Sequence, residues 1–160
     1  MKAMFPGSFD PMTLGHLDVV KRAAAIFDEV VVAVFYNPSK KNTFTADERV
    51  QMIKKAIHDI PNASVMAFSC GQLEGARRIG AKVVIRGIRT VSDFEYEAPW
   101  AQINRQEAED IEYVFLMSDP ALSVASSSAV KEIAMFDYDL SSYVPKVIIP
   151  DIQNAVRRQK

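Results

Sequence analysis

Residues 3–35 read AMFPGSFDPMTLGHLDVVKRAAAIFDEVVVAVF, and this stretch is the clearest indication of the fold class. It opens with a short apolar run at 3–5, which Pro6 and Gly7 close. Apolar residues then recur at helical spacing from 15 to about 28. The continuous apolar, mostly β-branched run at 30–35 is typical of a strand buried on both faces. The stretch therefore predicts a strand, a helix and a second strand.

The rest of the chain continues this alternation. Further strands are predicted at 64–68, 83–85 and 113–117. Thr45 and Glu48 fit a capping box that opens a helix, and Ser92 and Glu95 fit a second one. Strands that alternate with helices pair in parallel through right-handed crossovers. We therefore expect one α/β domain over residues 1–160, with a parallel five-stranded sheet and helices on both faces.

Composition and charge exclude several classes of protein. Apolar residues make up 49% and charged residues 24% of the chain, as in ordinary globular proteins. The net charge of −1 gives no basic excess that would indicate a nucleic-acid partner. The N-terminus has no long apolar run, so we expect neither a signal peptide nor a membrane partner. The single Cys70 has no disulfide partner, which favours a reducing cytoplasm.

Unusual residues follow the first predicted strand. In open parallel sheets, ligands bind beyond the carboxyl ends of the strands. Gly7 and Ser8 follow the strand directly, and Gly15 and His16 open the next helix. Free N–H groups and the dipole at a helix N-terminus attract phosphate, and an imidazole there can donate a hydrogen bond to it. An isolated Gly-His pair would indicate only a turn with a solvated histidine, but this position in the fold favours a function.

Basic residues and hydroxyls follow later strands. Lys40 suits a triphosphate or an acidic acceptor, although lysine pairs usually lie in solvated loops. Arg86 and Arg89 follow the fourth strand and would form an anion clamp, because each guanidinium can bind phosphate through two N–H groups. Surface charge is the weaker alternative there. The serines at 126–128 could seat a phosphate at a helix N-terminus or could simply cap that helix.

Together these residues resemble the nucleotidylyltransferase superfamily, which is marked by an H/T-x-G-H element and a late Ser-Ser-Ser/Thr element. Within it, the chain is similar to the bacterial phosphopantetheine adenylyltransferase family. The RGIR stretch at 86–89 and the DFEYE stretch at 93–97 point to this branch. The matching stretches follow the family's order through nearly the whole chain, at 6–11, 15–18, 38–41, 44–50, 85–89, 93–97, 114–117 and 126–132.

The resemblance implies a dinucleotide-binding-like fold and transfer of AMP from Mg-ATP to 4′-phosphopantetheine, giving dephospho-coenzyme A and pyrophosphate. It also implies a cytoplasmic homohexamer in coenzyme A biosynthesis, with Mg²⁺ held mainly through the ATP phosphates and no metal ligands from the protein. The implied catalytic residues are His16, Lys40 and Arg89. The implied ATP contacts are Ser8, Phe9, His16, Gly87, Ile88, Arg89, Glu97, Leu122, Ser123, Val124, Ala125, Ser126, Ser127 and Ser128. The implied acceptor contacts are Ser8, Lys40, Gln72 and Arg86.

The implied chemistry needs no general base, because the acceptor phosphate is already ionised at neutral pH. Catalysis then consists of positioning and of preorganised positive charge around an in-line displacement at the α-phosphorus. One alternative is adenylyl transfer to another acceptor, such as nicotinate mononucleotide. Another is a nucleotide-binding sensor without turnover, against which the presence of both His16 and Lys40 argues.

Pro99 breaks the pattern of the helix that Ser92 is predicted to cap. Its ring clashes with the carbonyl of Glu95, which also loses its N–H partner. The sequence therefore predicts a bend between Glu95 and Trp100, with Trp100 largely buried in the assembled oligomer. The alternative is a helix that begins later, with Pro99 in its first turn.

Overall fold

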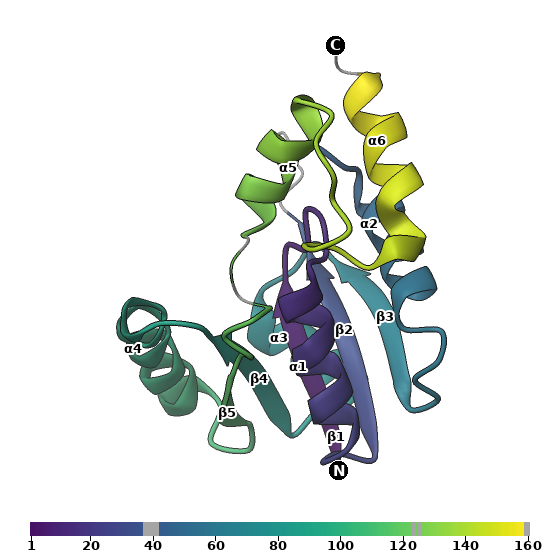
Figure 1. The fold of residues 1–160 in the computed structure, drawn as a ribbon. Helices are drawn as coiled ribbons and strands as arrows, with labels where there is room; N and C mark the ends of the chain where they lie inside the picture. The colour runs from purple at the N-terminus through teal and green to yellow at the C-terminus, as the bar shows by residue number, and fades with distance from the viewer. Residues whose placement is uncertain (37–41, 123, 125, 159–160) are drawn as a thin grey trace.

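A five-stranded parallel sheet forms the centre of the computed structural model, which describes residues 1–36, 42–122, 124 and 126–158 (Figure 1). Its order is β3-β2-β1-β4-β5, and every neighbouring pair is parallel. The strands are β1 (Lys2–Gly7), β2 (Glu29–Phe35), β3 (Ala63–Phe68), β4 (Val83–Ile88) and β5 (Glu112–Met117). The predicted number of strands and their parallel pairing are confirmed.

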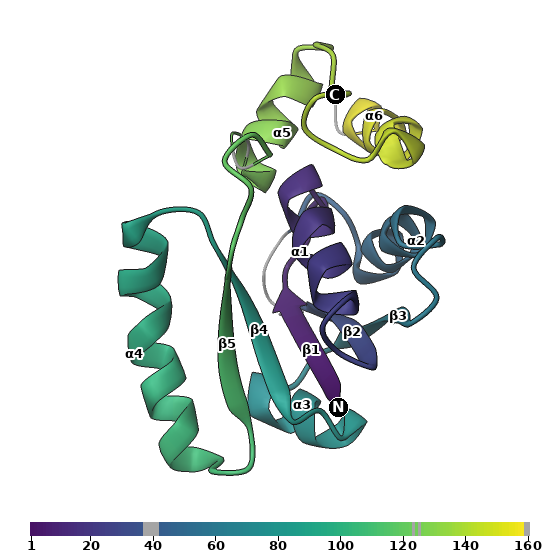
Figure 2. The same cartoon turned by 60° about the horizontal axis from the view of Figure 1, so that its bottom comes forward.

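Helices cover both faces of the sheet, as predicted. They are α1 (Leu14–Ala24), α2 (Ala46–Ala56), α3 (Gln72–Ile79), α4 (Val91–Glu107), α5 (Ser127–Met135) and α6 (Ile149–Arg157), with a short 3₁₀ turn η1 (Lys146–Ile148). Figure 2 shows α1 and α2 on one side of the sheet and α4 on the other. Helices α5 and α6 pack together beyond the carboxyl ends of the strands (Figure 1). In the described part of the chain, no helix combines the length and the apolar character that crossing a bilayer would require.

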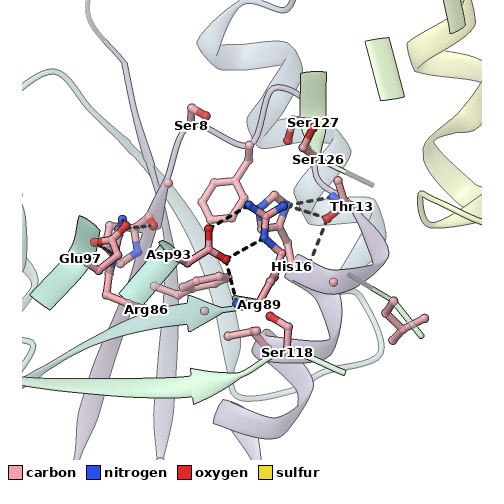
Figure 3. Close-up of a pocket in the computed structure, with 18 of the residues that line it drawn as sticks. Ser8, Thr13, His16, Arg86, Arg89, Asp93, Glu97, Ser118, Ser126 and Ser127 are labelled. Atoms are coloured by element: carbon pink, nitrogen blue, oxygen red, sulfur yellow. Dashed lines mark hydrogen bonds and ion pairs between the residues drawn. The ribbon is translucent and has the colours of Figure 1, made fainter. Parts of the chain in front are cut away.

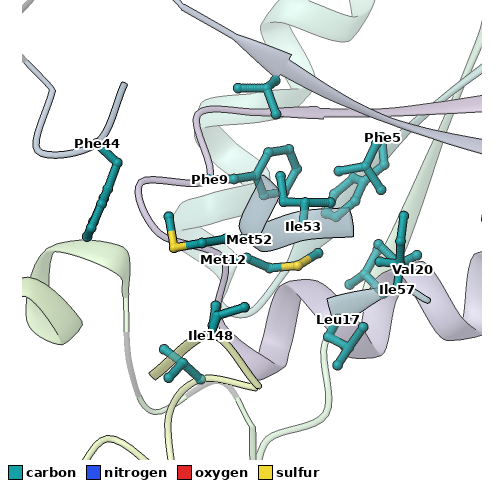
Figure 4. Close-up of a cluster of buried hydrophobic side chains, with 14 of the residues drawn as sticks. Phe5, Phe9, Met12, Leu17, Val20, Phe44, Met52, Ile53, Ile57 and Ile148 are labelled. Carbon is teal, nitrogen blue, oxygen red and sulfur yellow. The ribbon is translucent and has the colours of Figure 1, made fainter. Parts of the chain in front are cut away.

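Alternating side chains of the strands build two apolar layers. In β1, Ala3 and Phe5 face the larger cluster with α1 and α2, while Met4 faces the smaller cluster on the other side. The larger cluster also holds Phe9 and Met12 from the loop after β1 (Figure 4). Both side chains are almost fully buried, so the core fixes the loop that leads to the candidate site.

Two predicted boundaries are wrong near the fourth strand. The strand does not end at 85, because β4 pairs with β5 as far as Ile88, so Arg86 lies within the strand. The helix after it is capped by Thr90 and not by Ser92. The Thr90 hydroxyl accepts the N–H of Asp93 at 3.2 Å, and the Asp93 carboxylate accepts the N–H of Thr90 at 3.2 Å. This reciprocal pair satisfies two N–H groups that would otherwise be unpaired at the start of α4.

Helix α4 runs through Pro99 without interruption, so the alternative of a later helix start is wrong. A bend between Glu95 and Trp100 stays a prediction. No residue of α4 is buried, and Trp100 is 53% exposed. The chain by itself therefore does not bury Trp100, and its burial in an assembled oligomer stays a prediction.

Candidate active site

A pocket of about 370 Å³ lies at the carboxyl ends of β1 and β4 (Figure 3). The chain leaves β1 toward β2 and β3 on one side and later returns to β4 and β5 on the other. Such a reversal of strand order is where open α/β sheets bind ligands. The predicted site residues that line the pocket are Ser8, Phe9, His16, Arg86, Gly87, Arg89, Glu97, Leu122, Ser126 and Ser127.

His16 is oriented by the N-terminus of its own helix. Thr13 caps α1, and its hydroxyl accepts the His16 N–H at 3.3 Å. In return the backbone N–H of Thr13 donates to Nδ1 of His16 at 3.0 Å. Because Nδ1 accepts a backbone N–H, the proton of the neutral imidazole lies on Nε2. Phe9 packs edge-on against the ring at 5.1 Å between centroids and so restricts its rotation.

His16 is neutral at physiological pH. Burial and, to a smaller extent, the positive charge of Arg89 together lower the pKa of His16 from 6.5 to about 4. A neutral imidazole with its proton on Nε2 is a hydrogen-bond donor. A phosphate monoester becomes a dianion with a pKa near 6, and His16 stays neutral through that pH range. The pocket therefore contains a fixed donor rather than a titrating acid.

This shift has a measurable consequence for stability. Between pH 6.5 and pH 4 the unfolded chain binds a proton at His16 that the folded chain does not bind, so stability must fall as the pH falls through this window. We expect the free energy of unfolding of the unmodified protein to drop about 2 kcal/mol more than that of His16→Gln between pH 7 and pH 4.5. Urea unfolding at the two pH values measures this difference.

His58 provides the control, because it is exposed and lies in neither apolar cluster. The pH dependence of His58→Gln is measured in parallel, so that the general effect of replacing a histidine by glutamine is subtracted. Equal losses for His16→Gln and the unmodified protein would show that His16 is not held in its neutral form.

The two predicted clamp arginines both reach the pocket, and each is paired with a carboxylate of α4. Arg86 binds Glu97 through both nitrogens of one guanidinium edge, with Nε to Oε2 at 2.8 Å. Arg89 donates from Nε to Asp93 Oδ2 at 3.2 Å and from Nη2 to Oδ1 at 3.3 Å. Burial raises the pKa of Asp93, but the hydrogen bonds and charge of Arg89 outweigh that effect and hold this pKa below its ordinary value.

Two serines at the start of α5 make hydrogen bonds within the protein and also line the pocket. The Ser126 hydroxyl accepts the N–H of Ala129 at 3.2 Å and so caps the helix. The Ser127 hydroxyl donates to the carbonyl of Pro11 at 2.8 Å and ties α5 to the loop after β1. Both residues still line the pocket. The capping interpretation is confirmed for Ser126, and a phosphate seat at these hydroxyls stays a prediction.

A glycine allows the close approach of α1 to the segment before α5. A Cβ at Gly15 would lie 3.1 Å from the carbonyl oxygen of Leu122, tighter than side chains normally tolerate. Gly15 thus lets the N-terminus of the helix that carries His16 approach the backbone at Leu122.

Some predicted site residues lie elsewhere. Lys40, Ser123 and Ala125 lie outside the described residues. Ile88 is buried in β4, Val124 is 77% exposed, and neither of them nor Ser128 lines the pocket. Gln72 begins α3, away from the pocket, and its buried Nε2 has no hydrogen-bond partner among the described residues.

Sequence reasoning missed a buried charged residue that joins three segments around the site. Asp10 is 5% exposed, and its carboxylate accepts the N–H groups of Thr43 at 3.2 Å and Phe44 at 2.9 Å. It also accepts Lys131 Nζ of α5 at 3.0 Å. The fully buried Arg49 of α2 donates to the carbonyl of Ser8 at 2.8 Å. The short buried run FDP at 9–11 lies in a loop and gives no periodic signal, so only the position of Asp10 after the first strand could have suggested this role.

Comparison with known proteins agrees with this geometry. A family model described as cytidylyltransferase-like matches residues 4–133. A phosphopantetheine adenylyltransferase of Lachnoclostridium phytofermentans is 48% identical over 146 residues, which cover 91% of this chain and 90% of that protein. One of Clostridium novyi is 45% identical over 154 residues, which cover 96% of each.

A solved structure shows the same fold at low sequence identity. It comes from Vibrio parahaemolyticus, is described as a candidate nicotinate-nucleotide adenylyltransferase and superimposes with a TM-score of 0.74 at 18% identity. The superposition covers 99% of this chain and 96% of that one. Because the curated relatives align over nearly their full lengths at 44–48% identity, the chain belongs to the phosphopantetheine adenylyltransferase family of nucleotidyltransferases.

Proposed function

We propose that this chain transfers AMP from ATP to 4′-phosphopantetheine and so forms dephospho-coenzyme A and pyrophosphate in coenzyme A biosynthesis. The observation that carries the proposal is the meeting of neutral His16, Arg86 and Arg89 in one pocket at the strand-order reversal. The family's curated members are named for this acceptor, which supports its choice over other phosphorylated acceptors.

The reaction is a single in-line displacement. An oxygen of the acceptor phosphate forms a bond to the α-phosphorus of ATP as the bond from that phosphorus to the β-phosphate oxygen breaks, and pyrophosphate leaves with the electron pair. The acceptor oxygen is already ionised, so no side chain must remove a proton. The pocket instead brings two polyanions together and stabilises the charge that develops at the α-phosphate.

Each group of the pocket has a proposed task. The Nε2–H of His16 donates to an α-phosphate oxygen, and the N-terminus of α1 adds its dipole in the same direction. Arg89 neutralises the nucleotide phosphates, with Lys40 as a further catalytic cation. Ser8, Arg86 and Lys40 hold the acceptor, with Gln72 at its far end. The remaining contacts named for ATP in the sequence complete the nucleotide site.

Mg²⁺ is proposed to arrive with ATP. Among the described residues there is no group of three or more His, Cys, Asp or Glu side chains that could hold a metal ion. The carboxylates that line the pocket, Asp93 and Glu97, are each engaged by an arginine. A pocket whose carboxylates are already paired with arginines fits a Mg²⁺ ion that is held mainly by the phosphate oxygens of ATP. The ion would neutralise part of the phosphate charge.

A homohexamer in the cytoplasm completes the proposal. Helix α4 exposes large apolar side chains, among them Phe94 at 47%, Tyr96 at 68%, Trp100 at 53% and Ile103 at 49%. This helix lies along the edge strand β5. Further copies of the chain would cover part of this helix, because large apolar side chains gathered at a protein surface are typical of an interaction site. The single Cys70 suits a reducing compartment.

The acceptor is tested by measuring pyrophosphate release from ATP and Mg²⁺ with 4′-phosphopantetheine, with nicotinate mononucleotide and without an acceptor. We expect release only with 4′-phosphopantetheine. Pyrophosphate release with nicotinate mononucleotide but not with 4′-phosphopantetheine would mean that the acceptor is a different one. Intact ATP binding without release in any mixture would favour a nucleotide sensor.

A further inference from the structure

The Arg86–Glu97 pair occupies the part of the arginine that a phosphate would need. Nε and Nη2 of Arg86 both donate to the Glu97 carboxylate, with Nε to Oε2 at 2.8 Å. This edge of a guanidinium can bind a phosphate group with two parallel hydrogen bonds, and the other edge is partly taken because Nη1 donates to the carbonyl of Pro6. Carboxylate and phosphate therefore cannot both occupy the edge of Nε and Nη2 in this geometry.

The charged side chains that line the described part of the pocket balance one another. The charged side chains among the described residues that line it are Arg86, Arg89, Asp93 and Glu97, which give two positive and two negative charges. His16 adds none, because it is neutral. These four side chains offer an entering anion no net charge, so it gains most attraction if it replaces one of the two carboxylates at its arginine.

The two carboxylates differ in how firmly they are held. Asp93 accepts the backbone N–H groups of Arg89 at 2.9 Å and Thr90 at 3.2 Å, so it is part of the cap of α4. Among the described residues, the Glu97 carboxylate is hydrogen-bonded to Arg86 alone. Glu97 is thus the carboxylate that can leave without breaking the start of the helix.

Arg86 would keep its position after such an exchange. Its Nη1 donates to the carbonyl of Pro6 at 3.2 Å, on the opposite side from the edge that Glu97 uses. The side chains of Arg86 and Glu97 are only 23% and 17% exposed, so an unpaired guanidinium would be costly there. The replacement of one charge-assisted pair by another avoids that cost.

We propose that Glu97 is an internal counterion of Arg86 that an incoming phosphate group must displace, and that this competition sets the pocket's preference for phosphate dianions over weaker anions. The inference deepens the proposed function, since it rests on Arg86 as the acceptor's phosphate contact. A carboxylate or chloride carries a single charge and gains little by replacing Glu97. A phosphate dianion brings more charge and a third oxygen for further donors, so it alone wins the exchange.

The test is a titration with inorganic phosphate, followed by ³¹P NMR at constant pH and ionic strength, without ATP or acceptor. We expect Glu97→Gln to bind phosphate about tenfold more tightly than the unmodified protein, because a neutral amide competes poorly for the guanidinium. Glu95→Gln is the matched control. It removes the same charge from the same helix, but Glu95 is exposed and does not line the pocket.

A double variant separates displacement from general electrostatics. In an Arg86→Gln background, Glu97→Gln should leave the phosphate affinity unchanged, since there is no guanidinium to release. Equal tightening by Glu97→Gln with and without Arg86 would overturn the proposal. So would unchanged or weaker phosphate binding in Glu97→Gln, which would mean that Glu97 holds Arg86 in place for the anion. Thermal unfolding of each variant checks the fold, and the titration is independent of whether adenylyl transfer occurs.

Discussion

Replacement of His16 by alanine should lower the turnover number of adenylyl transfer by roughly 10²–10³-fold, the usual scale for the loss of one preorganised donor at a developing charge. The structure supplies the reason. The Thr13 N–H donates to Nδ1 and leaves the proton on Nε2, and the lowered pKa keeps that form neutral. ATP affinity should change much less, because the contact is strongest in the transition state. Single-turnover kinetics and calorimetry of ATP binding measure the two effects.

A second substitution separates the donor from the helix cap. Glutamine at the third helical position fits a capping box, so His16→Gln should recover the stability that His16→Ala loses. The glutamine amide is flexible and does not hold an N–H donor at the position of the imidazole Nε2, so the turnover number should remain low. Recovery of turnover together with stability would reassign His16 to a structural role, and equal losses in ATP affinity with unchanged turnover would make it a plain binding residue.

Replacement of Asp10 by alanine should lower the free energy of unfolding by about 3 kcal/mol, because it removes a buried acceptor of two backbone N–H groups and the counterion of the partly buried Lys131. The Lys131 ammonium would lose its 3.0 Å partner, and the N–H groups of Thr43 and Phe44 would lose their acceptor. Asp10 is 5% exposed, so water replaces these contacts poorly. Urea unfolding measures the change.

The matched control is Asp151→Ala, which breaks a pair with Lys55 at the surface. These side chains are 35% and 48% exposed, and pairs of this kind contribute about 1 kcal/mol or less. Asp10→Ala should therefore be much the more destabilising of the two. Equal losses of unfolding free energy in the two variants would mean that the contacts of Asp10 with the three segments do not stabilise the fold.

The sequence predicted best those features that depend on local pattern. Buried β-branched runs such as the one in β2 mark strands without ambiguity, and the Thr45–Glu48 capping box starts α2 as expected. The cap at Thr90 was missed because its reciprocal partner, Asp93, is neither Glu nor Gln, the usual residues of that motif. The same chemistry at Thr13 uses a histidine, so no standard motif signals it.

Features that depend on packing between elements could not be predicted. Arg86 seemed to follow its strand because the apolar run stops there, but pairing with β5 extends β4 to Ile88. The ion pair between Arg86 and Glu97 joins β4 to α4, and it forms only because of the direction in which α4 leaves the sheet. Asp10 likewise meets Lys131 only because α5 packs across the loop after β1.

The proposed function requires that the acceptor phosphate attacks the α-phosphorus of ATP in this pocket. It is tested most directly with 4′-phosphopantetheine whose terminal phosphate oxygens are oxygen-18, incubated with the protein, ATP and Mg²⁺, followed by mass spectrometry of both products. We expect dephospho-coenzyme A that retains all of the label, with unlabelled pyrophosphate. Release of AMP with a pyrophosphorylated acceptor, or loss of label from the acceptor phosphate, would contradict attack at the α-phosphorus.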